Sequence, residues 1–182
     1  TQILIKPDDS TKAILEFVCS EANKLTNSAI YYCRQMFFKA HKYVSSYELD
    51  EIMKSNLHFK ALRSAVAQQA CHKVAESFKS YRQLAKLYRE GKLEDKPSLP
   101  HYRKRQGFTA VSYSARWLKL ENTQIKFTLG IRVKLWFAID SFTLPMPSNL
   151  NFKDIKEIRI LPRNQCFYAE FVYRQKQFKS KL

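Results

Sequence analysis

Residues 92–107, "KLEDKPSLPHYRKRQG", separate two halves of the chain that differ in their hydrophobic period. Before this stretch, apolar residues recur at helical spacing. After it, apolar and polar residues alternate, as they do in half-buried strands. The stretch is polar, contains two prolines and ends in the adjacent cations Arg103, Lys104 and Arg105. We therefore expect a basic connector at 92–107 between a helical and a β segment.

Three helices are expected upstream of the connector. "DDS" (8–10) offers N-cap side chains to a helix that reaches about Tyr43. Ser45 and Glu48 form a capping-box signature for a short helix that ends near Lys54. A long helix should follow from about Leu57 to Arg89, with Gly91 as its stop. The buried stripe expected for that helix is Phe59, Leu62, Val66, Ala70, Val74, Tyr81, Leu84 and Tyr88.

Strand patterns lie at both ends of the chain. "QILIK" (2–6) is a short strand ended by Pro7, and "ENTQ" (121–124) and "PRNQ" (162–165) are hairpin signals. The expected strands after the connector are "AVSYS", "WLKLE", "QIKFTLG", "IRVKLWF", "IKEIRIL" and "FYAEFVY". The expected fold is α+β: a small antiparallel β-barrel (1–8 and 108–182) interrupted after its first strand by a helical lobe (9–91).

The charge of the chain is strongly positive. It contains 32 Lys and Arg against 16 Asp and Glu, a formal charge of +16. A field of this sign makes polyanions the expected partners. No apolar run reaches transmembrane length, so a membrane partner is not expected. The four cysteines are scattered without a CxxC pair, which indicates reduced thiols in a cytoplasmic protein rather than a zinc site or disulfides.

One face of the long helix should contact nucleic acid. At 100° per residue, seven residues fall in a narrow sector opposite the apolar stripe, and none of them is an acid. Gln68, flanked by small residues, suits bidentate contact to adenine, while the cations suit phosphates. An ordinary solvated face is the alternative. The members of this sector are Ser64, Gln68, Cys71, Ala75, Lys79, Arg82 and Lys86.

The cations of the connector belong to the same hypothesis. Three adjacent cations cannot share one face, so their repulsion persists unless anions such as phosphates neutralise it. Tyr102 and His101 could stack on an unpaired base, although Tyr102 could equally pin the connector to the core. A solvated basic linker remains the alternative for this segment.

No catalytic or metal-binding residues are expected. Metal-dependent phosphodiester cleavage needs carboxylates that converge on one or two ions, and the acids of this chain are dispersed. Nucleophile elbows and phosphate-cradling glycine loops are absent as well.

Four stretches in this order resemble the amino-terminal part of the TnpB (OrfB-type) transposon proteins, which are RNA-guided DNA nucleases. The basic connector resembles the family's proline–aromatic–basic segment, and the last stretch resembles a family hairpin. The stretches are "VAQQACHKVAESFKSYRQL" (66–84), "KPSLPHYRKR" (96–105), "WLKLENTQIKF" with "IRVKLWF" (117–137), and "IKEIRILPRNQCFYAEFVY" (155–173).

The resemblance implies a wedge barrel with an inserted recognition lobe in a protein of the prokaryotic cytosol. It implies guide-RNA binding by the barrel and connector, and the reading of a short duplex DNA motif. By the resemblance, Gln68, Ser64 and Tyr47 would face that duplex, with Ser114 at the barrel entry. The residues implied to hold nucleic-acid backbones are Lys79, Arg82, Arg103, Lys104 and Arg105.

The family's RuvC-like nuclease domain, with its acidic Mg²⁺ ligands, is not expected in these 182 residues. No cofactor is therefore assigned to this chain. The leading hypothesis is a nucleic-acid-binding lobe whose chemistry resides elsewhere. A stand-alone repressor or transposition accessory protein that binds DNA without RNA is the runner-up, and a basic protein–protein adaptor is a third class.

Overall fold

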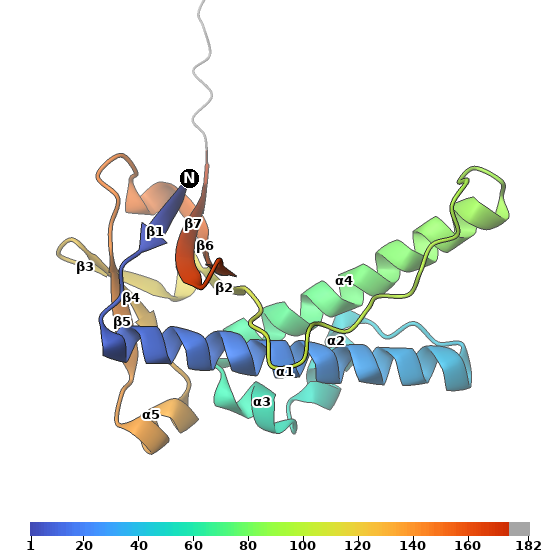
Figure 1. Cartoon of the computed structure of the whole chain (residues 1–182), viewed down its shortest axis with the longest axis horizontal. Helices are drawn as coiled ribbons and strands as arrows, with labels where there is room; N and C mark the ends of the chain where they lie inside the picture. The colour runs from blue at the N-terminus through green and yellow to red at the C-terminus, as the bar shows by residue number, and fades with distance from the viewer. Residues whose placement is uncertain (175–182) are drawn as a thin grey trace, which may run out of the picture.

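The computed structural model describes residues 1–174, so the predicted β segment at 175–182 lies outside the described residues. Figure 1 shows two long helices below and beside a group of strands, with α4 projecting away from the body. The first half of the chain contains β1 (Gln2–Ile5), α1 (Asp9–Ala40), α2 (Ser46–Met53), α3 (Leu57–Ala61) and α4 (Ser64–Arg89). The helical insertion after the first strand is therefore confirmed.

The second half contains six strands and a short helix. A 3₁₀ turn, η1 (Ala115–Trp117), joins β2 to β3, and a second, η2 (Phe152–Asp154), precedes β6. The remaining elements are β2 (Val111–Ser114), β3 (Leu118–Glu121), β4 (Gln124–Thr128), α5 (Ile131–Phe137), β5 (Ser141–Pro145), β6 (Ile155–Arg163) and β7 (Cys166–Tyr173). The α+β class predicted from the sequence is confirmed.

The described strands form two antiparallel sheets and not the expected closed barrel. One sheet has the order β1-β7-β6-β2, and the other has the order β3-β4-β5. β1 joins the larger sheet by pairing with β7, with Ile3 opposite Ala169. The chain passes from one sheet to the other at η1, where the 3₁₀ turn interrupts the ladder. No ladder joins β5 to β1, so the described sheets stay open there.

The predicted N-caps at Asp8 and Ser45, the glycine stop and the hairpin turns are confirmed, while the first helix ends at Ala40 rather than near Tyr43. The Asp8 side chain accepts a hydrogen bond from the Thr11 N–H at 2.7 Å and caps α1. Ser45 and Glu48 form the expected capping box on α2. Gly91 has a φ of +71° just beyond α4, a conformation that glycine adopts without strain. Both hairpin turns contain asparagine at positive φ, Asn122 and Asn164.

The predicted single helix from Leu57 to Arg89 is wrong, because the chain breaks at Leu62 and Arg63. Both residues are extended, with ψ values of 159° and 135°, and they separate α3 from α4. The backbone of Gly130 lies against this break: a Cβ on Gly130 would lie 2.9 Å from the Leu62 carbonyl carbon. The extended backbone at the break thus allows the β part of the molecule to pack closely against it.

"IRVKLWF" forms α5 rather than the expected strand. Helical spacing places Val133 and Phe137 on one face, where Val133 is buried and the Phe137 ring meets Phe17 of α1 at 5.6 Å. The third strand of the smaller sheet is instead β5, which the sequence analysis did not predict. β5 pairs with β4, with Phe142 opposite Phe127.

One continuous core joins the helices to the sheets. Within the stripe predicted for α4, Val66 and Val74 are buried, but Leu84 and Tyr88 are 42% and 39% exposed. The reason is visible in Figure 1, where the last turns of α4 extend beyond the other helices. Within residues 1–174, no helix is both long and apolar enough to cross a membrane.

Candidate nucleic-acid interface

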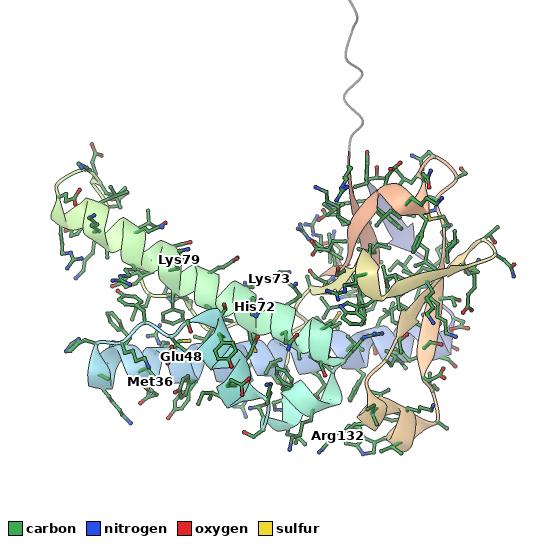
Figure 2. All side chains as sticks on the ribbon, turned by 180° about the vertical axis from the view of Figure 1, so that it is seen from behind. Met36, Glu48, His72, Lys73, Lys79 and Arg132 are labelled. Carbon is green, nitrogen blue, oxygen red and sulfur yellow. The ribbon has the colours of Figure 1, made fainter. Side chains whose placement is uncertain are left out.

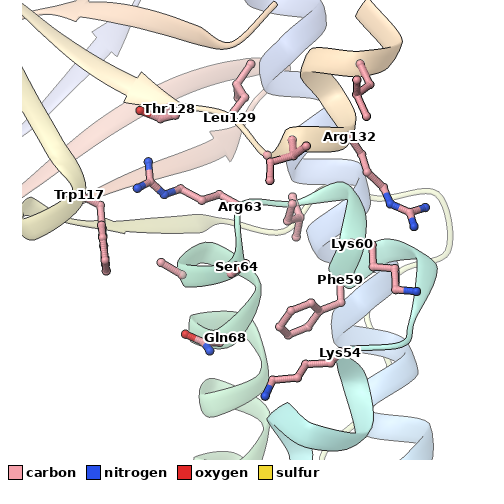
Figure 3. Close-up of a pocket in the computed structure, with 15 residues that line it drawn as sticks. Lys54, Phe59, Lys60, Arg63, Ser64, Gln68, Trp117, Thr128, Leu129 and Arg132 are labelled. Carbon is pink, nitrogen blue, oxygen red and sulfur yellow. The ribbon is translucent and has the colours of Figure 1, made fainter.

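A basic cleft lies where the break between α3 and α4 meets the turn between β4 and α5 (Figure 3). It has a volume of about 970 Å³ and an apolar floor that includes Phe59 and Leu129. We call it the α4 cleft. The polar and charged side chains that line it, together with Trp117, are Lys54, Lys60, Arg63, Ser64, Gln68, Thr128 and Arg132.

Two guanidinium groups are held against one indole ring at the wall of the α4 cleft. The Arg63 Cζ lies 5.1 Å from the centre of the Trp117 ring, and the Arg116 Cζ lies 5.3 Å from it. Trp117 is 44% exposed, so this cluster faces solvent. Cation–π contact orients the two guanidinium groups without neutralising them. The cluster can therefore donate hydrogen bonds to an anion.

The structure brings together Ser64, Gln68 and Ser114, which the sequence analysis placed near a duplex. Ser64 and Gln68 line the α4 cleft from the first turns of α4. Gln68 and Ser114 also line an adjoining cavity together with Arg116 and Trp117. The two cavities share Arg63, Gln68 and Trp117, so they form one continuous surface.

The predicted sector of α4 does not lie opposite the buried face. Cys71 is fully buried and Ala75 is 7% exposed, so this part of the sector lies on the packed side of α4, which contacts both α1 and α2. Burial raises the pKa of the Cys71 thiol to about 12. The sector from Ser64 to Lys86 is therefore not one continuous exposed surface. Its two ends are exposed separately, and its middle is buried.

Lys79 lies on the projecting half of α4, well away from Arg132 of the α4 cleft (Figure 2). Arg82 and Lys86 follow it further along the same helix. The Arg82 guanidinium sits over the Tyr43 ring at 5.1 Å. The Lys86 Nζ lies 3.9 Å from a carboxylate oxygen of Glu90, so the expectation that this face lacks acids is wrong at its distal end. Tyr47, on α2, is 73% exposed and does not line the α4 cleft.

The connector is fastened along α1 by amide side chains. Asn27 Nδ2 donates to the Arg103 carbonyl at 3.2 Å, and Asn27 Oδ1 accepts from the Arg103 N–H at 2.7 Å. One helical turn earlier, Asn23 Nδ2 donates to the Lys104 carbonyl at 3.0 Å, and its Oδ1 accepts from the Thr109 hydroxyl at 2.9 Å. These bonds hold the backbone of the basic triplet on α1.

Arg103, Lys104 and Arg105 are exposed. A turn closed by the Gly107 N–H on the Lys104 carbonyl at 3.1 Å follows the triplet. Within residues 1–174, none of the three cations forms an ion pair with a carboxylate. The ion pairs of Lys and Arg there involve Lys24, Lys42, Lys54, Lys86, Lys92, Lys126 and Arg159.

Sequence reasoning missed the residues that organise both surfaces. Arg63 could have been found only by recognising the helix break, for which neither glycine nor proline gives a signal. Arg116 and Trp117 are adjacent in the sequence, but Trp117 was expected to begin a strand and Arg116 fell between two expected strands. Asn23 and Asn27 are spaced by one helical turn on a helix face, a pattern that does not predict which backbone they bind.

The titratable clusters do not form a recognisable catalytic arrangement. His58 Nδ1 lies 2.5 Å from Glu21 Oε2, and His72 Nε2 lies 2.7 Å from Asp50 Oδ2, at separate places. Lys73 Nζ donates to the Ser112 hydroxyl at 2.8 Å and links α4 to β2, while burial lowers the pKa of the lysine. Among residues 1–174, no three His, Cys, Asp or Glu side chains cluster as metal ligands would.

The chain matches no protein-family model and no curated protein.

Proposed function

We propose that this chain binds nucleic acid as the amino-terminal part of a TnpB-type RNA-guided DNA endonuclease. It binds guide RNA and a short motif in duplex DNA, and the nuclease that would cut DNA belongs to a domain outside this chain. The observation that carries the proposal is the pair of surfaces, the α4 cleft and the connector, where exposed cations stand largely without carboxylate partners.

The α4 cleft supports the duplex-binding part of the proposal. Arg63 and Arg116 are fixed on Trp117, in positions suited to phosphate oxygens. The first turn of α4 contains no acid, and its N-cap has no side-chain hydrogen bond, so the positive end of the helix dipole opens into the cleft. Gln68 adds an amide that can pair with an adenine edge in a major groove.

The connector supports the RNA-binding part. The Asn27 and Asn23 anchors fix its backbone, so the three cations lose little freedom when they meet phosphates. Each phosphate contact should steepen the salt dependence of binding by roughly one unit of slope. Arg103, Lys104 and Arg105 together should account for as many as three such units.

Two charge-removal variants separate the two surfaces. Arg63→Ala/Arg116→Ala should weaken duplex DNA binding at least tenfold, because it removes both guanidinium groups from the Trp117 ring, one at the α4 cleft and one at the adjoining cavity. Arg103→Ala/Lys104→Ala/Arg105→Ala should instead weaken the binding of a structured RNA and lower its salt slope. Fluorescence anisotropy with a labelled DNA duplex and a labelled RNA hairpin, at four salt concentrations, measures both effects.

A matched control removes cations that already pair with carboxylates. Lys42→Ala/Lys92→Ala lowers the net charge by two, as the cleft variant does, but its lysines contact Glu48 and Glu90. It should change both affinities less than threefold. If the control weakens binding as much as the cleft variant, net charge alone drives binding and the proposed interface is wrong. Tight duplex binding with no RNA binding would favour a DNA-binding repressor or accessory protein.

A further inference from the structure

We propose that the face of α1 beside the connector is a stacking platform for unpaired bases of a single-stranded nucleic acid. We call it the α1 platform and define it by Tyr31, Arg34 and Phe38 of α1 together with Tyr102 of the connector. The inference deepens the proposed function and rests on it. It specifies that the nucleic acid bound by the α1 platform is single-stranded.

The three aromatic rings of the α1 platform are open to solvent. Tyr31, Phe38 and Tyr102 are 58%, 55% and 49% exposed. Tyr31 and Phe38 are seven residues apart on α1, which places them on the same helix face about 10.5 Å apart along the axis. Stacked bases are about 3.4 Å apart, so this distance can span several nucleotides.

Arg34 joins two of the rings, those of Phe38 and Tyr102, into one surface. Its Cζ lies 5.5 Å from the centre of the Phe38 ring and 5.4 Å from the centre of the Tyr102 ring. Its Nη1 also donates to the Pro100 carbonyl at 3.0 Å, which fixes the guanidinium plane. A fixed guanidinium plane among aromatic faces is itself a stacking surface for a base.

Charge complementarity identifies the occupant. The connector carries Arg103, Lys104 and Arg105 directly after Tyr102, so cations for a backbone adjoin rings for bases. The acids of α1 lie at Glu21 or earlier, ten or more residues from Tyr31, or about 15 Å along the axis. Glu21 itself is engaged by Lys24 and His58.

A single strand fits this combination better than a duplex. The bases of a duplex already stack on one another, so their faces are closed to protein rings, while the faces of an unpaired base are available. A groove beside Tyr102, about 570 Å³ in volume and also lined by Ser77, Ser80 and His101, offers hydrogen-bonding groups to a base edge. A protein partner would have no comparable use for three cations beside the rings.

The test uses the whole chain with a labelled 12-nucleotide oligouridylate and a labelled blunt-ended RNA duplex without a loop. Tyr31→Ala/Phe38→Ala should weaken oligouridylate binding at least tenfold and duplex binding less than twofold, because stacking energy is lost only for unpaired bases. Tyr31→Phe/Phe38→Tyr keeps both rings and should bind both probes as the wild type does. Trp136→Ala, which removes a ring of similar exposure (51%) on α5, should also leave both affinities unchanged.

A second readout does not depend on a variant. A strand that contains 2-aminopurine should lose fluorescence on binding to the wild-type chain, because stacking on a ring quenches this base. Unchanged fluorescence, or an equal loss of oligouridylate and blunt-duplex affinity in the alanine variant, would overturn the inference. If the wild type binds the duplexes but not the oligouridylate, the α1 platform alone is wrong. If it binds no nucleic acid, the proposed function fails as well.

Discussion

Gly130 brings the β part of the molecule into close contact with the break that positions Arg63. It is buried and has a φ of −67°, which any residue can adopt, so only the space around it demands glycine. We expect Gly130→Ala to destabilise the protein and to weaken duplex DNA binding, since the added methyl group displaces the backbone from which Arg63 extends.

The magnitude follows from the distances. A Cβ at Gly130 would lie 2.9 Å from both the carbonyl carbon and the carbonyl oxygen of Leu62, and 3.1 Å from the Arg63 nitrogen. Backbone atoms cannot rotate away as a flexible side chain would, so the two segments must separate by roughly half an ångström or more to restore normal contact. Overpacking of this kind typically costs about 1–3 kcal/mol. For a chain of this length, 2 kcal/mol lowers the Tm by about 4–8 °C.

Thermal unfolding followed by circular dichroism measures the first effect, and anisotropy with a DNA duplex measures the second. Gly91→Ala is the matched control, because nothing lies within 4 Å of its added Cβ and its cost is only the strain of a φ of +71° at a helix end. That variant should lose about 1 kcal/mol and keep its duplex affinity. If Gly130→Ala unfolds at the wild-type temperature, the two segments are not in tight contact and our explanation of the helix break is wrong.

Three further predictions concern the fold. In native protein at pH 8, a thiol reagent should label Cys166 quickly, and only unfolding should expose the thiols whose pKa burial raises to about 12, namely Cys19, Cys33 and Cys71. Hydrogen bonds from Lys42 and Ser45 hold the pKa of Glu48 below its ordinary value of 4.5. The stabilising effect of the Glu48 carboxylate is therefore complete above pH 4.5 and is lost as the pH falls through the folded-state pKa. The difference in urea midpoint between wild type and Glu48→Gln should shrink from about pH 7 to about pH 3. Asn23→Ala should cost about 2–3 kcal/mol in urea unfolding, because it removes two buried hydrogen bonds that hold the connector; a loss below 0.5 kcal/mol would show that the connector does not depend on them.

Local signals in the sequence predicted the elements whose ends are determined by local chemistry. The caps at Asp8 and Ser45, the stop at Gly91 and the two asparagine turns lie where expected, because each depends on a side chain and its immediate backbone. The α+β class followed from the change of period at the connector. β1 was correctly expected to join the later strands, since a lone strand cannot satisfy its backbone.

Features that depend on distant contacts were not predictable. "IRVKLWF" fits both an alternating and a helical pattern over seven residues, so its sequence alone does not decide between strand and helix. In the helix that forms, Phe137 packs on Phe17 of α1, a contact that the local pattern does not show. The helix breaks at Leu62, where the backbone of Gly130, more than 60 residues away in the sequence, packs closely against it. The orientation of the α4 sector depends on how α4 packs on α1 and α2, which leaves Cys71 and Ala75 buried. For the same reason, two predicted groups of contact residues proved to lie on separate surfaces.

The salt dependence of nucleic-acid affinity tests the central claim most directly. The claim is that exposed cations without carboxylate partners, at the α4 cleft and the connector, bind phosphate backbones. The affinity of the whole chain for a DNA duplex and for an RNA hairpin should fall linearly with the logarithm of salt concentration, with slopes that correspond to several phosphates. Affinities that are undetectable at 50 mM salt, or that do not change between 50 and 300 mM, would contradict it.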